Sequence, residues 1–252
     1  MKLNFKKIGE GKPLLILHGL FGSLDNWGSL GKKFAENNLV YLIDLRNHGR
    51  SPHSEEMSYD LMVDDLLELI QDENINSPII LGHSMGGKAA LLFAEKYPKY
   101  LDKLIVADIG MKAYPMHHDV ILKGLNSVNL QEISSRNQAQ QFIQVHINNL
   151  GIQQFLLKNL YWIEKGKLAW RMNLREIEKN IGEILKKINI HKNPTDTLFI
   201  RGEMSNYILE EDFENILKSF PNAEIKTIPK VGHWLHAENP IEFYKIVREF
   251  II

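Results

Sequence analysis

The 252-residue sequence contains no cysteine. This absence excludes disulfide bonds, thiol nucleophiles and metal sites with thiolate ligands, so any nucleophile must be oxygen or nitrogen. An excess of one charge is also missing, because 30 Lys and Arg residues stand against 31 Asp and Glu residues, for a formal net charge of −1. A chain without surplus cations has little to neutralise a phosphate backbone or an anionic lipid surface. We therefore expect neither nucleic acid nor a membrane surface as a partner.

Long hydrophobic runs are missing as well. The longest purely apolar runs, such as residues 14–17 and 104–107, are far shorter than the roughly 20 residues of a membrane helix, so no membrane insertion is expected. The start of the chain, MKLNFKKIGE, has only isolated apolar residues and lacks the apolar stretch of a signal peptide. These features predict a cytoplasmic protein.

The composition that remains, 44% hydrophobic and 24% charged, is typical of a globular protein with a packed core. Short, nearly continuous apolar runs alternate with segments of helical period. Such runs suit strands that are covered on both faces, so we predict an α/β fold with a mostly parallel, doubly wound sheet. The predicted strands are at residues 13–19, 39–45, 77–83, 101–110, 195–202 and 223–229.

Two helices are well marked at their starts. Ser58 is a good N-cap for an apolar stripe that runs to residue 70, and Asn239 followed by Pro240 predicts the start of the last helix. The alternation breaks once, between residues 111 and 193, where helical periods occur without a strong strand. A loop of that length is improbable inside a compact domain. We therefore predict an α/β core of residues 1–110 and 194–252, with residues 111–193 inserted as a helical cap.

The segment Gly82-His83-Ser84-Met85-Gly86 follows one predicted strand and opens a helical stretch. Glycines two residues before and after Ser84 allow the strand and the helix to approach closely, which leaves the serine exposed at the tip of a sharp turn. A glycine-rich turn with a helix-capping serine is the plainer interpretation. The position between strand and helix favours Ser84 as a nucleophile.

A serine hydroxyl needs an imidazole to accept its proton and a third group to orient that imidazole. Among ten histidines, His233 follows the strand at 223–229 and so lies at the same sheet edge as Ser84. His236 is the competing candidate. His83, next to the serine, is assigned to packing beside it, and His117 and His118 have no carboxylate or histidine at ligand spacing. No metal site is expected.

The oxyanion of an acyl-transfer intermediate needs two backbone N–H donors. One should come from the residue after the nucleophile, Met85, and the other from the loop after an early strand, residues 18–22. Leu20 is the first choice for the second donor, with Phe21 as the alternative.

Four motifs together carry a resemblance to a known family. They are HGLFGS at 18–23, DLRNHGRS at 44–51, GHSMGG at 82–87 and GHWLHAENP at 232–240. In this order they resemble the α/β-hydrolase family, and more narrowly the bacterial YbfF-type esterases and the eukaryotic abhydrolase-domain-11 proteins. The resemblance implies hydrolysis of carboxylic esters and acyl thioesters without metal or organic cofactor. It also implies that Asp44, Arg46 and His48 brace the floor of the active site.

The acid of the triad departs from the commonest pattern of the family. That pattern places an aspartate where this chain has Ser205 or Asn206, while the strand at 101–110 carries Asp108 at its end. The YbfF-type relatives are similar in placing their acid there. Asp108 is therefore the predicted acid, and Glu203 is the alternative.

The sequence thus predicts a serine hydrolase whose substrate is a small-molecule acyl ester or thioester. Rival interpretations are a C–C hydrolase, a lyase of the menaquinone-pathway type that uses the same residues, or a ligand-binding protein on a hydrolase scaffold. We expect the substrate pocket to be lined by aromatic residues near the nucleophile and in the cap: Phe21, His83, Trp162, Trp170 and Trp234.

Overall fold

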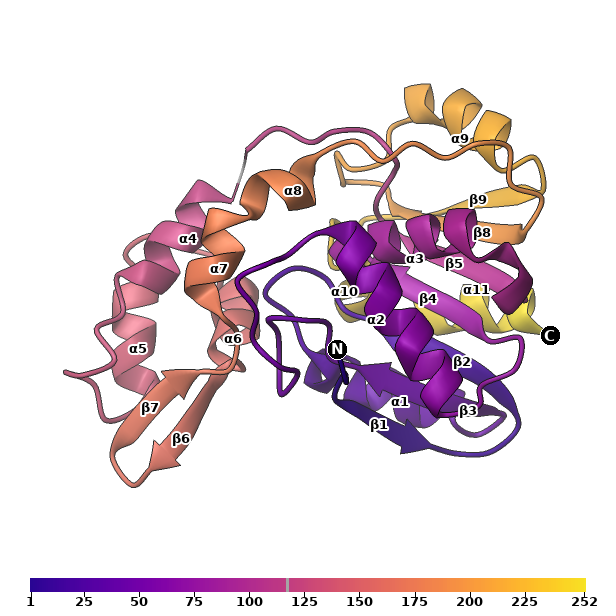
Figure 1. Cartoon of the computed structure of the whole chain (residues 1–252). Helices are drawn as coiled ribbons and strands as arrows, with labels where there is room; N and C mark the ends of the chain where they lie inside the picture. Colours follow the sequence, from indigo (N-terminus) through magenta and orange to yellow (C-terminus); the bar gives the residue numbers. More distant parts are fainter. Residues whose placement is uncertain (117) are drawn as a thin grey trace.

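The computed structural model describes residues 1–116 and 118–252, so the expectation for His117 lies outside the described residues. Its main feature is a seven-stranded sheet in the order β1-β3-β2-β4-β5-β8-β9 (Figure 1). All pairs are parallel except β1 with β3. The strands are β1 Phe5–Ile8, β2 Lys12–Leu17, β3 Asn38–Ile43, β4 Ile79–His83, β5 Lys103–Ala107, β8 Asp196–Gly202 and β9 Ala223–Ile228. The predicted doubly wound fold is confirmed, and only the antiparallel edge strand β1 was not predicted.

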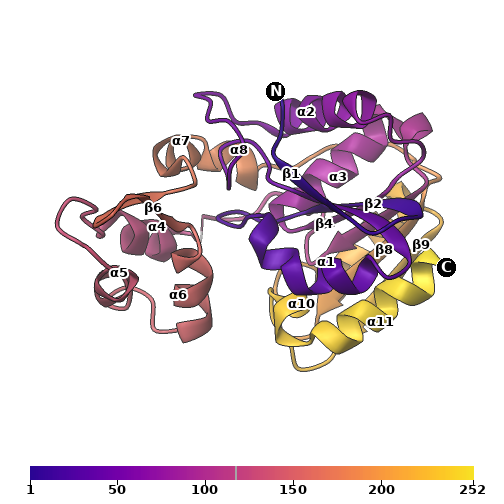
Figure 2. The ribbon, with the colours of Figure 1, turned by 90° about the horizontal axis from the view of Figure 1, so that it is seen from below.

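The nearly continuous apolar runs are explained by two separate hydrophobic clusters, one on each face of the sheet. In β2, for example, Leu15 and Leu17 belong to the cluster under α2 and α3, while Leu14 and Ile16 belong to the cluster under α1 and α11. Figure 2 shows these helix pairs on opposite sides of the sheet. Alternate residues of a strand face opposite sides, so a strand that is covered on both faces has no polar positions.

The core helices begin where the capping residues predict. The Ser58 hydroxyl accepts a hydrogen bond from Leu61 N–H at 3.3 Å, and the Asn239 side chain accepts one from Glu242 N–H at 3.2 Å. The helices of the core are α1 Gly28–Phe34, α2 Tyr59–Asp72, α3 Met85–Lys96, α9 Phe213–Ser219, α10 Leu235–Glu238 and α11 Pro240–Ile251, with 3₁₀ turns at Leu24–Trp27, Pro98–Tyr100 and Glu210–Asp212.

The segment predicted as a cap, residues 111–193, is called the cap segment below, and its described residues form helices and also a two-stranded antiparallel hairpin that the sequence pattern did not predict. Most side chains of the hairpin are exposed or half-buried, so its strands lack the apolar run of a buried strand. The long helical periods are also divided into shorter helices. The elements are α4 Asp119–Asn126, α5 Arg136–Ile143, α6 Leu150–Leu157, β6 Leu160–Glu164, β7 Lys167–Trp170, α7 Leu174–Lys179 and α8 Ile181–Leu185.

The two ends of the cap segment meet over α3. Buried Lys88 donates from Nζ to the carbonyl of Lys112 at 2.9 Å and to that of Lys186 at 2.5 Å, one in each connection to the core. The connections also bond each other, from Tyr114 N–H to the Leu185 carbonyl at 2.9 Å. Burial lowers the pKa of Lys88 to about 8. A single side chain therefore fastens both ends of the cap segment to the core.

Within residues 1–116 and 118–252, no helix combines the length and the apolar character that crossing a bilayer would need.

Candidate active site

Ser84 lies at the turn between β4 and α3, with φ 52° and ψ −118° and 9% of its surface exposed. A Cβ atom on Gly82 would lie 2.2 Å from the Gly86 carbonyl oxygen, and one on Gly86 would lie 2.6 Å from the His18 carbonyl oxygen. The two glycines are therefore needed for the close approach of strand, helix and neighbouring loop. A non-glycine residue held in so rare a backbone conformation costs on the order of 1–3 kcal/mol, which the packed elements around it must offset.

The structure brings together the three residues predicted as a triad. His233, in the loop after β9, lies with Nε2 3.0 Å from Ser84 Oγ and with Nδ1 2.8 Å from Asp108 Oδ2. The ring of Tyr207 stacks on the imidazole, with centroids 3.8 Å apart and planes at 13°. With the proton on Nδ1, Nε2 can accept the serine proton, so this arrangement can activate the hydroxyl.

The competing histidine, His236, has a different environment. It is buried and stacks on Trp27, with ring centroids 4.3 Å apart and planes at 9°. Burial lowers its pKa well below the usual value for histidine. His236 therefore packs against Trp27 and Phe243, and the imidazole that accepts from the Ser84 hydroxyl is that of His233.

Asp108 follows β5 with a positive φ of 50° and is fully buried. Its Oδ1 accepts from Gly202 N–H at 3.0 Å, and its Oδ2 accepts from the Ser205 hydroxyl as well as facing His233. Burial raises the pKa of this carboxyl to about 6, against the opposing effect of its hydrogen bonds. Ser205, one of the two residues at the position where the commonest pattern of the resembled family has its acid, thus donates a hydrogen bond to Asp108.

The alternative acid, Glu203, is exposed and accepts a hydrogen bond from Lys230 N–H at 2.8 Å. Its hydrogen bond to Lys230 is therefore separate from the contacts that join Ser84, His233 and Asp108.

One predicted oxyanion donor, Leu20, is in the turn after β2, and the other, Met85, is the first residue of α3, directly after the nucleophile. Neither Leu20 N–H nor Met85 N–H donates to another described residue. The alternative donor, Phe21 N–H, is occupied because it donates to His48 Nε2 at 3.2 Å. Of the two candidates in the turn, Leu20 is the one that can bind an oxyanion.

His83 supports the histidine loop. Its Nε2 lies 2.9 Å from the His233 carbonyl oxygen, and burial lowers its pKa to about 3, so the neutral ring donates this hydrogen bond. The expected packing role thus consists of holding the backbone of His233.

A cavity of about 330 Å³ opens beside Ser84 and is mainly apolar. Three of the predicted pocket residues, Phe21, His83 and Trp234, line it. Trp162 and Trp170 do not, because both lie on the β6–β7 hairpin, away from the cavity wall. The cap contributes shorter apolar side chains instead. They are Val120, Ile121, Ile147, Ile152 and Phe155.

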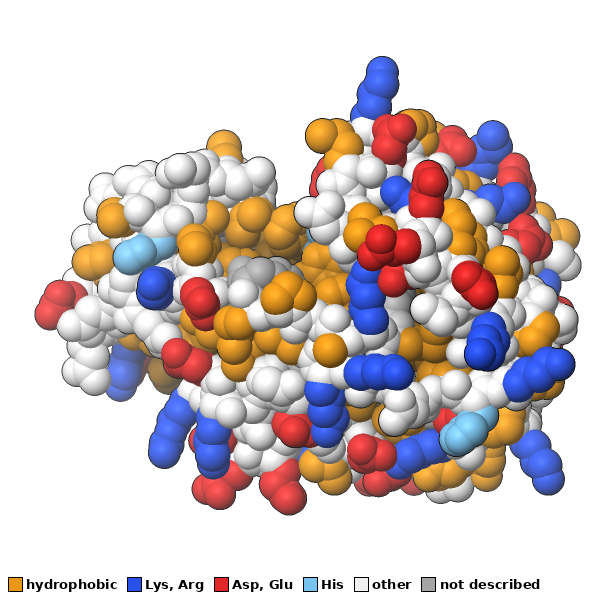
Figure 3. Space-filling view, turned by 90° about the horizontal axis from the view of Figure 1, so that it is seen from above, with side chains coloured by type: hydrophobic (Ala, Val, Ile, Leu, Met, Phe, Trp, Pro, Cys, Tyr) orange, Lys and Arg blue, Asp and Glu red, His pale blue; other side chains and the backbone are white. Residues whose placement is uncertain are grey.

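The surface between the cap segment and the core is hollowed on the face shown in Figure 3, where hydrophobic side chains gather. Most of the Lys and Arg side chains in this view lie outside the hollow.

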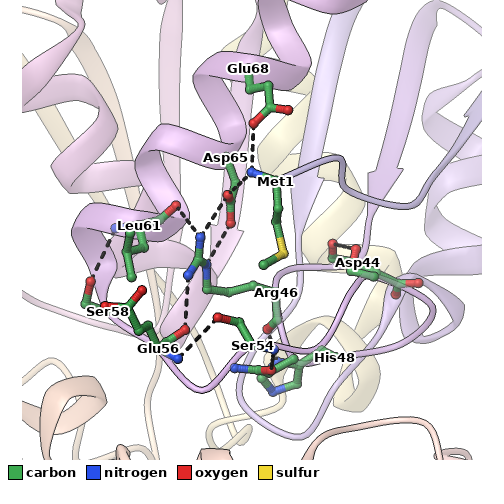
Figure 4. Close-up of polar contacts among 12 residues, drawn as sticks. Met1, Asp44, Arg46, His48, Ser54, Glu56, Ser58, Leu61, Asp65 and Glu68 are labelled. Carbon is green, nitrogen blue, oxygen red and sulfur yellow. Dashed lines mark hydrogen bonds and ion pairs between the residues drawn. The ribbon is translucent and has the colours of Figure 1, made fainter.

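The loop after β3 contacts the turn that contains Leu20, because His48 accepts from Phe21 N–H and Asp44 accepts from Leu24 N–H. Arg46 forms a bidentate pair with Asp65 of α2, from Nε at 2.7 Å and Nη2 at 2.9 Å (Figure 4). Asp44 Oδ1 accepts from Leu24 N–H at 2.7 Å, just beyond the turn that contains Leu20. Both acidic residues are buried, so these contacts fix the loop firmly.

Among the residues that the structure describes, no group of three or more His, Cys, Asp or Glu side chains is placed to hold a metal ion.

Comparison with known proteins agrees with this geometry. The family model of the alpha/beta hydrolase fold matches residues 12–126. Esterase YbfF of Escherichia coli is 34% identical over 259 residues, which span 100% of this chain and 99% of that protein. The chain belongs to the α/β-hydrolase family. The α/β-hydrolase named sn-1-specific diacylglycerol lipase ABHD11, from Danio rerio, is also 34% identical, over 96% of this chain and 79% of its own length.

A solved structure of this α/β-hydrolase group, described as a marine microorganism esterase, superposes with a TM-score of 0.96. The two chains are 43% identical, and the alignment covers 99% of each. The resemblance to YbfF-type esterases is thereby confirmed, and the chain is an α/β-hydrolase of the esterase and lipase type.

Sequence reasoning missed the contacts that three side chains make at the site, although Ser205 had been noted as the residue at the commoner acid position. Tyr207 stacks on His233, Ser205 binds Asp108, and Asn159 of the cap donates to the backbone of Phe21. Ser205 and Tyr207 lie directly after β8 at the sheet edge that carries Asp108, a position that signals proximity. Asn159 has no such local signal.

Proposed function

We propose that this α/β-hydrolase cleaves carboxylic esters, and acyl thioesters by the same chemistry, through an acyl-enzyme on Ser84. The observation that carries the proposal is the continuous chain of contacts from Ser84 Oγ to His233 Nε2 and from His233 Nδ1 to Asp108, beside an apolar cavity. The names of the relatives, esterase and diacylglycerol lipase, favour an oxygen ester with an apolar acyl group.

The reaction follows from the positions of these groups. Ser84 Oγ attacks the acyl carbonyl carbon while its proton moves to His233 Nε2, and the carbonyl oxygen becomes an oxyanion that Leu20 N–H and Met85 N–H bind. The bond to the leaving group breaks as His233 returns the proton to the departing alcohol or thiol. Water then attacks the acyl-enzyme with His233 as base, and the carboxylic acid leaves. Asp108 holds the imidazole in the Nδ1–H tautomer throughout.

The apolar cavity supports an acyl group of hydrocarbon character. Its cap side is made of aliphatic side chains and Phe155, and its core side includes Trp234 next to His233. The cytoplasmic location stays a prediction of the sequence.

The test combines labelling with product analysis. A fluorophosphonate probe should label the wild-type protein and leave Ser84→Ala unlabelled, and a C2 to C12 series of esters and acyl-CoA thioesters should yield the free acid. A wild-type protein that neither labels nor releases acid would refute the proposal and favour a binding scaffold. Release of a C–C cleavage or elimination product in place of the acid would assign the site to another reaction.

A further inference from the structure

The turn that carries Leu20 has an unusual backbone. Gly22 N–H donates to the Gly19 carbonyl at 2.9 Å, which closes a four-residue turn with Leu20 and Phe21 at its centre. Phe21 has a φ of 59°, although the third position of a turn with this geometry favours glycine. A bulky residue keeps such a conformation only where its surroundings hold it. The contacts of Phe21 therefore decide where Leu20 N–H points.

The core holds Phe21 from one side. His48 Nε2 accepts the Phe21 N–H at 3.2 Å, while His48 Nδ1 donates to the Arg46 carbonyl at 2.9 Å. Burial lowers the pKa of His48 to about 3, so the ring is neutral and its Nε2 lone pair is available as an acceptor. Arg46 is itself fixed to Asp65 on α2 (Figure 4).

The cap holds Phe21 from the other side. Asn159, between α6 and β6, donates from Nδ2 to the Phe21 carbonyl at 2.7 Å and to the Leu156 carbonyl at 3.2 Å. Both partners are carbonyl oxygens, so only the amide nitrogen can face them. The side chain is 3% exposed, and the Asn159 carbonyl in turn accepts from Arg171 N–H at 2.8 Å, after the hairpin. Figure 1 shows these elements on the cap side of the molecule.

We propose that Asn159 is a positioning residue through which the cap fixes the oxyanion turn. The inference rests on the proposed function. His48 of the core accepts from the Phe21 N–H, and Asn159 of the cap donates to the Phe21 carbonyl. In a closed turn the backbone angles of neighbouring residues are coupled. The position of the cap relative to the core thus sets the direction in which Leu20 N–H points. Loss of the Asn159 amide should weaken stabilisation of the transition state more than binding of the ground state.

The experiment compares Asn159→Ala and Asn159→Leu with wild type in steady-state hydrolysis of a p-nitrophenyl ester and in the rate of fluorophosphonate labelling. Leu fills about the space of Asn without a donor, so it separates the lost hydrogen bond from a cavity. Since removal of a whole oxyanion donor costs about 10²- to 10³-fold in kcat, a loosened donor should cost roughly 10-fold or more. KM should stay within about 3-fold, and labelling should slow with kcat.

The matched control is Asn173→Ala. Asn173 also donates across from the cap to the core, to the side-chain Oδ1 of Asn47 at 3.2 Å and not to Phe21, and its backbone N–H donates to the Asn47 carbonyl at 2.8 Å, a bond that the variant keeps. This variant should keep kcat and labelling within about 2-fold of wild type. Thermal unfolding of every variant establishes that the assays are done on folded protein.

Three results would overturn the inference while leaving the proposed function intact: an unchanged kcat in both Asn159 variants, an equal loss in Asn173→Ala, or a raised KM with kcat unchanged. Failure of the proposed function is a separate outcome, because it shows as wild-type protein without Ser84-dependent turnover.

Discussion

Replacing Asp108 by Asn tests the charge and the tautomer of the triad at once. The carboxylate accepts from Gly202 N–H on Oδ1, and on Oδ2 it accepts from Ser205 Oγ and faces His233 Nδ1. Asn offers one acceptor and one donor group. If its oxygen stays on Gly202, its NH₂ group donates to His233 Nδ1, which moves the imidazole proton to Nε2 and blocks acceptance of the serine proton. If the amide turns over, two N–H donors face each other at Gly202.

The first orientation removes the working tautomer of His233, the second places two donors against each other at Gly202, and neither balances the charge of the imidazolium. We expect kcat to fall by about 10²- to 10⁴-fold, which corresponds to about 2.7–5.4 kcal/mol of transition-state stabilisation at ~1.36 kcal/mol per factor of ten. The assay is kcat for an activated ester at pH 8, where Asp108 of the wild type, with a pKa of about 6, is ionised. Unfolding curves show that the variant remains folded.

Glu203→Gln is the matched control, since Glu203 is exposed and bonded to Lys230 N–H, and its kcat should change little. Ser205→Asp in the Asp108→Asn background should recover part of the activity, because Ser205 Oγ already lies against the carboxylate position. A near-normal kcat in Asp108→Asn together with a large loss in Glu203→Gln would refute this reasoning and move the acid to Glu203.

Three further expectations concern the nucleophile, the pH dependence and the cavity. Ser84→Ala should lower ester hydrolysis by about 10³-fold or more with stability within roughly 1 kcal/mol, and substantial remaining turnover would remove Ser84 as nucleophile. Activity should be present above pH 6 and decline as the pH falls through about 6, because protonated Asp108 cannot accept from His233; a flat kcat from pH 5 to 8 would contradict this. Phe155→Ala should shift relative kcat/KM toward longer acyl chains, whereas Trp162→Ala on the exposed hairpin should leave the C2 to C12 profile unchanged, and the reverse result would misplace the cavity.

The parallel sheet and the serine, histidine and aspartate were predictable because each depends on a short stretch of sequence. Ser84, Asp108 and His233 all follow strands whose carboxyl ends meet at one edge, so three local patterns were enough to place them together. The strand pattern was readable because both faces are covered. It failed for β6–β7, whose side chains are largely exposed.

The cap side of the pocket was harder to predict because it depends on packing between distant segments. Trp162 and Trp170 were natural choices by size, yet the hairpin holds them away from the cavity that Ile152 and Phe155 line. The hydrogen bond from Asn159 to Phe21 joins residues 138 positions apart. A lone asparagine between two cap elements has no pattern that reveals such a partner.

Lys88 joins the beginning and the end of the cap segment at one point of the core. Both crossings between core and cap segment pass this one ammonium, so the inserted stretch starts and finishes at a single place on the surface of the core. The entropy of closing a loop rises only slowly with its length, by about 0.6 kcal/mol for each doubling. Changes of length within the stretch should therefore leave its junction unaltered, so the cavity beside Ser84 can be reshaped without any change in the sheet that carries Ser84.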